Sequence, residues 1–136
     1  MADVTVTAGN VVPAAGYQFT DGVAGATIGA GQTVYSDAAA SNTIKLADNN
    51  ASTATKACVG IAVNSAASGQ PVRYMHGGTL AFGAVLTLGT AYAVSSNAGG
   101  ICPVADWGAG HYRVTLGIAT STSNLAVKVH NSGVTD

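Results

Sequence analysis

The sequence predicts an all-β protein: an antiparallel β-sandwich or barrel made of two similar halves. Apolar residues recur at every second position, and no stretch shows the 3.6-residue period of a helix. Gly, Asn, Asp and Ser, the residues that turns require, bound each alternating run. The turn signals recur about every 8–12 residues, a spacing typical of sandwiches and barrels.

The alternation predicts strands in order along the chain. In each run, Val, Ile, Leu or Tyr alternates with a polar or small residue, so one face of each strand is apolar. Residues 51–56 are the one place where a single helical turn is expected. The predicted strands are centred on residues 4–7, 44–46, 59–63, 72–74, 114–118 and 127–129.

The first 25 residues differ from the rest, because glycines and Pro13 interrupt every apolar piece and Tyr17 and Phe19 are the only large side chains. We expect residues 1–25 to form an extended arm that leaves the body, and residues 26–136 to form a single β domain. About 20 extended residues span ~60 Å, enough to reach a neighbouring molecule. An ordinary edge strand with a frayed terminus is the alternative.

An internal repeat divides the domain into pseudo-repeats of about 26–80 and 83–136. At a constant offset, Tyr35 matches Tyr92, Ile44 matches Ile101, and the Gly-Ile-Ala triplet at 60–62 matches that at 117–119. Each half is a meander too small to be stable alone, so the two apolar faces are expected to pack together. Gly60 and Gly117 are expected to permit a close approach of neighbouring chain.

The composition indicates a surface that other molecules cover. Of the 136 residues, 48% are hydrophobic and mostly small, only 8% are charged, and Glu is absent. An average soluble domain is about a quarter charged. With a net charge of −1, a free monomer has little colloidal protection. We therefore expect contacts with other copies or with a partner; a secreted, Ser/Thr-rich β-domain is the alternative.

Several function classes are disfavoured. The five basic residues are scattered, which argues against nucleic-acid binding. No apolar run has the length of a membrane span, and the first residues do not resemble a signal peptide, so cytoplasmic synthesis is expected. Cys58 and Cys102 are expected to be buried and reduced, although one disulfide stays open as an alternative.

Catalytic motifs are also missing from the sequence: it contains no HExxH, CxxC, phosphate-binding loop or GxSxG. We predict a protein that is not an enzyme and has no cofactor. His76, His111 and His130 could converge on a metal, but strand-end surface positions are the favoured interpretation. Trp107, surrounded by turn residues, is expected on a loop, either as a lid over the core or as a contact anchor.

The segment Cys58–Leu80, CVGIAVNSAASGQPVRYMHGGTL, resembles one common in head decoration proteins of tailed phages. The shared pattern is a Val-Gly-Ile strand, a turn with Ala and Gly, an alternating strand and a closing Gly. Residues 116–133 look like a degenerate second copy, so the likeness covers about half of the chain. The matching residues are Val59, Gly60, Ile61, Ala62, Gly69, Val72, Tyr74, Gly78 and Leu80.

The resemblance implies a small virion protein, often trimeric, that binds the major capsid protein on the outer surface of an expanded capsid. The duplication departs from the compact single-copy layout of the lambda-type members. A glycan-binding or adhesion module of a fibre or tail, or another minor virion protein, is the alternative; a glycan site would need exposed aromatics such as Tyr17, Tyr112 or Trp107. The residues expected to contact the capsid or other subunits are Val4, Val6, Val11, Tyr17, Phe19, Trp107 and Tyr112.

Overall fold

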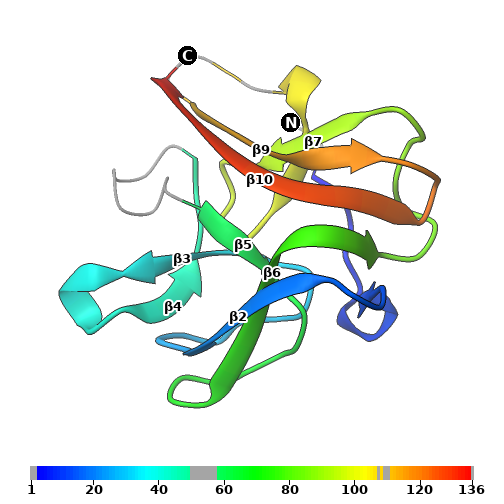
Figure 1. Ribbon diagram of the computed structural model, residues 1–136. Helices are drawn as coiled ribbons and strands as arrows, with labels where there is room; N and C mark the ends of the chain where they lie inside the picture. Colours follow the sequence, from blue (N-terminus) through cyan, green and yellow to red (C-terminus); the bar gives the residue numbers. More distant parts are fainter. Residues whose placement is uncertain (1–2, 50–57, 107, 109–110, 136) are drawn as a thin grey trace.

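A computed structural model describes residues 3–49, 58–106, 108 and 111–135 of the chain. The described part is all-β, which confirms the predicted fold class: antiparallel strands form one continuous sheet that curls into a half-barrel (Figure 1). Three short 3-10 turns interrupt the strands, at Ala8–Asn10, Ala38–Ala40 and Val104–Asp106. The expected helical turn at 51–56 lies outside the described residues, as does Trp107.

The sheet contains the same strand arrangement twice. Each half has four strands, numbered here along the chain. Across the sheet, the first strand of a half lies between its second and third strands, and the fourth strand lies on the other side of the third. The two fourth strands, β6 and β10, pair with each other and join the halves, so the order is β4-β3-β5-β6-β10-β9-β7-β8. The first half comprises β3 (Thr33–Asp37), β4 (Thr43–Leu46), β5 (Cys58–Ala62) and β6 (Pro71–Ala81). The second comprises β7 (Ala91–Val94), β8 (Ile101–Pro103), β9 (Tyr112–Ala119) and β10 (Asn124–Thr135).

The two halves differ in register by one residue. Val34 lies opposite Gly60 in the first half, whereas Tyr92 lies opposite Gly117 in the second. Because side chains alternate between the two faces of a strand, a one-residue shift changes which residues face the core. Ile61 is therefore fully buried, whereas its sequence match Ile118 is 54% exposed.

Two hydrophobic clusters lie on opposite faces of the sheet. The main core fills the inside of the curl and contains residues of both halves. An outer core lies on the other face of the first half, since its residues Val34 and Ala62 directly neighbour the main-core residues Tyr35 and Ile61 along their strands. The largest fully buried side chains of the main core are Phe82, Ile61, Met75, Leu80, Ile101, Leu116 and Leu125.

The N-terminal segment lies on the body, which corrects the expectation of an arm that leaves it. Strands β1 (Val12–Pro13) and β2 (Gln18–Val23) both pair with β6, and Val4 N–H donates to Ile101 O over 2.8 Å. Val11 is only 7% exposed. The segment is extended as predicted, but the length of β6 offers it backbone partners that local sequence does not reveal.

Among the described residues, no helix is long and apolar enough to span a membrane.

Candidate interaction surfaces

The aromatic–arginine cluster consists of Tyr17, Phe19 and Asp21 on or just before β2, and Arg73 on β6. Antiparallel pairing places Asp21 directly opposite Arg73. The Arg73 guanidinium donates from Nε to Asp21 Oδ1 over 2.7 Å and from Nη2 to Oδ2 over 3.2 Å. Its carbon also lies 3.9 Å from the centroid of the Phe19 ring, and the Tyr17 and Phe19 centroids are 5.1 Å apart.

The charges of this cluster neutralise each other. The hydrogen bonds from Arg73 lower the pKa of the Asp21 carboxyl, and Asp21 in turn raises the pKa of Arg73. Arg73 Nη1 also donates to the Tyr17 hydroxyl over 3.4 Å. The Phe19 side chain is nevertheless 42% exposed, so the cluster presents a neutral, partly aromatic surface.

Strand β2 also presents an open edge. Among the described strands, β6 is the only one that forms a ladder with β2, and the opposite edge of β2 is open up to the isolated bridge between Ala24, directly after β2, and Ile44 of β4. Val23, at the end of β2, is also exposed. An unpaired edge with exposed apolar side chains is a surface to which another chain can add a strand.

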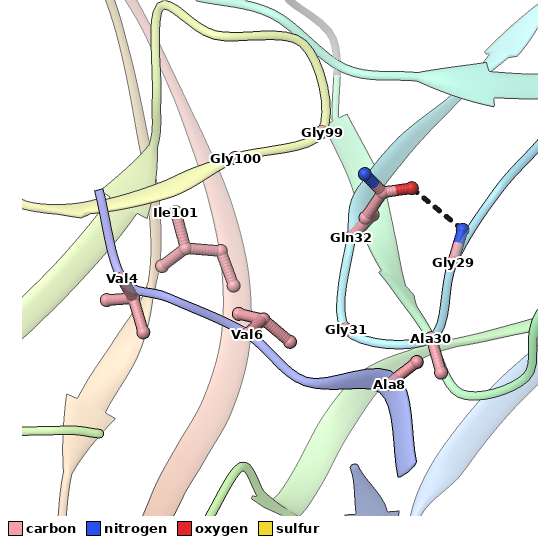
Figure 2. A pocket seen from close by; sticks show the side chains of 10 residues that line it. All are labelled: Val4, Val6, Ala8, Gly29, Ala30, Gly31, Gln32, Gly99, Gly100 and Ile101. Atoms are coloured by element: carbon pink, nitrogen blue, oxygen red, sulfur yellow. Dashed lines mark hydrogen bonds between the residues drawn. The ribbon is translucent and has the colours of Figure 1, made fainter. Parts of the chain in front are cut away.

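A cavity of about 310 Å³ lies beneath the N-terminal segment. Figure 2 shows this segment crossing from Ile101 to the turn at residues 29–32, with Val4 and Val6 along it. Gly29 N–H donates to Gln32 Oε1 over 2.7 Å, which holds the turn in shape. None of the lining residues is charged, so the cavity brings together no acid, base or nucleophile.

The structure brings together only some of the predicted contact residues. Tyr17 and Phe19 meet in the aromatic–arginine cluster. Val4, Val6 and Tyr112 pack partly buried against the main core, and Val11 belongs to it. Val11 is therefore not the accessible contact residue that the sequence suggested. Trp107 lies outside the described residues.

Sequence reasoning missed Asp21 and Arg73, because nothing local indicates that residues so far apart in the chain lie opposite each other. It also proposed Tyr17 and Tyr112 as exposed aromatics for a glycan site. Both are only partly exposed and pack against the main core, and the Arg73 guanidinium lies over the Phe19 ring. The described aromatics thus do not form an open stacking platform over a groove.

In the described part of the chain, no group of three or more His, Cys, Asp or Glu side chains could hold a metal ion. His76 lies 3.4 Å from the Thr20 hydroxyl, and Nδ1 of His111 accepts from Gly108 N–H over 2.9 Å. Cys58 and Cys102 are free, buried thiols, and burial raises the pKa of each to about 12.

No family model and no curated protein matches the chain. The segment Cys58–Leu80 forms β5, the turn after it and most of β6. It thus contains Arg73 and the strand that pairs with β2.

Proposed function

We propose that the chain is a non-enzymatic structural subunit of a virion, which binds the outer surface of a tailed-phage capsid and stabilises the shell, acting as a homotrimer. The observation that carries the proposal is the open edge of β2 with its exposed, charge-neutral aromatic–arginine cluster. The edge offers backbone hydrogen bonds to a strand of the shell protein, and Phe19 offers an apolar and aromatic contact beside it.

The composition supports a crowded, multi-copy setting. Only 8% of the residues are charged, and the ion pairs Lys45–Asp37 and Arg73–Asp21 neutralise charge within the chain. Many identical copies on one shell then repel each other weakly. The resemblance of residues 58–80 to decoration proteins points to the same setting.

Such a subunit stabilises the shell by burying surface area at the contact, and no chemical reaction is needed. A trimer that bridges a seam between capsid subunits adds buried surface that must be lost before the shell opens. Three modest contacts on one rigid body act together, so the combined affinity exceeds that of a single contact by orders of magnitude.

The direct test measures shell rupture. Expanded shells made of the major capsid protein from the same phage genome are heated with and without the purified protein. The release of DNA or of an enclosed dye is followed. We expect the protein to raise the rupture temperature and to bind in high copy number, with native mass spectrometry showing trimers. A monomer that binds no shell, or a protein that turns over a substrate, would refute the proposal.

A matched pair of variants tests the surface. Phe19→Ala removes the exposed ring of the cluster and is expected to weaken shell binding about tenfold, in line with loss of an interface anchor. Leu88→Ala is the control, because Leu88 is even more exposed but lies on the loop before β7, away from β2. Equal binding by the two variants would exclude this surface from the contact.

A further inference from the structure

The outer faces of the two halves are covered differently. In the first half, residues 24–30 cross the outer face and bury it: Ile28 exchanges two backbone hydrogen bonds with Ala66, and Gly25 N–H donates to Ile44 O. Ala24 and Ile28, each 1% exposed, complete the outer core. A covering segment of small and apolar residues thus converts this face into a second core.

The second half has no such cover among the described residues. The segment that precedes β7 turns to the inside of the curl, where Phe82 and Leu86 join the main core. The outer face of β7, β9 and β10 instead holds a groove of about 490 Å³, and Ile118 in it is 54% exposed. The other apolar residues that line it are Ala91, Gly117 and Ala126.

The groove is basic as well as apolar. Lys128 and His130 line it together with Thr115, and no acidic residue does. Neither Lys128 nor His130 forms an ion pair in the described part of the chain. The groove therefore combines the apolar side chain of Ile118 with the ammonium group of Lys128, which has no ion-pair partner there. These two groups complement a segment that carries an apolar side chain beside a carboxylate.

The described part of a second copy of the chain is a poor source of that carboxylate. Asp21 and Asp37 are in ion pairs, Asp3 accepts from Ser95 and Asn97, and Asp48 and Asp106 also have partners. All five described aspartates are thus engaged within their own chain. Charge complementarity favours a different protein as the occupant.

The geometry points to this groove as the docking site for an extended segment of the shell protein that carries an apolar residue next to Asp or Glu. The segment covers the second half as residues 24–30 cover the first, with the apolar side chain on Ile118 and the carboxylate at Lys128. This inference rests on the proposed function, whose capsid partner it describes more closely.

The experiment measures binding of the full-length protein to expanded shells of the major capsid protein. Ile118→Asp and Lys128→Glu are each expected to weaken binding at least tenfold while the circular dichroism spectrum stays that of the wild type. Gln70→Glu is the control: it adds a negative charge on an exposed turn of the other half, where the carboxylate still accepts the hydrogen bond from Ala67 N–H.

A photo-crosslinker identifies the occupant. With p-benzoylphenylalanine at position 118, we expect adducts to a shell-protein peptide that has Asp or Glu within about three residues of the attachment point. If wild-type protein binds no shell, the proposed function fails and the inference with it. If wild type binds and both groove variants bind equally well, or if adducts form only between copies of this chain, the groove assignment is overturned while the proposed function stands.

Discussion

At the residue scale, two glycines explain how strands of this sheet approach each other. A side chain at Gly60 would meet the backbone of Met75 and the ring of Tyr74, and one at Gly117 would meet the carbonyl oxygen of Ala126. The predicted close approach at both glycines is confirmed. Gly117 also has φ +150°, a conformation that other residues rarely adopt.

Gly117→Ala is expected to lower the free energy of unfolding by about 2–4 kcal/mol, because backbone strain and a collision with a neighbouring strand act together. Gly89→Ala is the control: φ is +81° there too, but the space is open, so only strain of about 1 kcal/mol is expected. Urea denaturation measures both. Equal losses would show that the contact with Ala126 is unimportant.

The Asp21–Arg73 pair makes a pH-dependent contribution. Since Arg73 lowers the pKa of Asp21 from its ordinary value of 3.8, the folded state gains stability above that value and loses it as the pH falls through the lowered pKa. In Arg73→Gln, the pKa of Asp21 is expected to return toward 3.8, as measured by NMR titration. Lys45→Gln is the control, which should raise the pKa of Asp37 and leave that of Asp21 unchanged.

At the scale of elements, the N-terminal segment is part of the folded body. Val4 and Val6 pack against the main core, and the carboxylate of Asp3 accepts from Ser95 Oγ over 2.6 Å and from Asn97 Nδ2 over 2.9 Å. Within residues 3–9, only Val4 forms a backbone hydrogen bond with a strand, and its partner is Ile101 of β8. Apolar packing rather than strand pairing therefore holds residues 3–9.

Deletion of residues 1–9 is expected to lower the free energy of unfolding by about 2–4 kcal/mol, since two valine side chains lose their contacts with the core. Thermal unfolding measures the loss. The double variant Thr5→Ala/Thr7→Ala serves as control, because both threonines are exposed and should change stability by less than about 0.5 kcal/mol. An unchanged melting temperature after the deletion would show that residues 1–9 form an arm that does not stabilise the body.

Alternation predicted five of the six strand centres correctly, because a face that must be buried imposes a period of two, but the strand predicted at residues 4–7 does not form. Val59–Ile61 lies in β5, Val72–Tyr74 in β6, and Val114–Leu116 in β9. Partners far along the chain were not predictable: neither the pairing of β2 with β6 nor the meeting of Asp21 with Arg73 leaves a local signal. The exposure of Ile118 could not be predicted from the sequence either, because it depends on a one-residue difference in register between two similar halves.

At the scale of the whole molecule, the two halves form one unit. The main core contains Ile61 and Met75 of the first half and Val94 and Leu116 of the second. Backbone bonds also link the halves, for example from Gly99 N–H to Ala47 O over 2.7 Å and from Tyr112 N–H to Asn49 O over 2.7 Å. Neither half can bury its apolar face without the other.

The intact chain is therefore expected to unfold in a single transition, with equal calorimetric and van't Hoff enthalpies. Fragments 1–82 and 83–136, which separate the two fourth strands, are each expected to lack a cooperative transition by circular dichroism. A fragment that melts sharply alone would show that one half folds independently and that the other only docks onto it.

The docking of the first residues onto the second half has a consequence for synthesis on the ribosome. The hydrogen-bond partners of Asp3 lie 92 and 94 residues later in the chain, and the backbone partner of Val4 is Ile101. A nascent chain halted before that point exposes two valines that only later translation can cover, and contacts so distant in sequence slow folding. Residues 3–9 can thus dock only after Ile101 has been synthesised, and a product terminated before that point exposes Val4 and Val6 to chaperones and proteases.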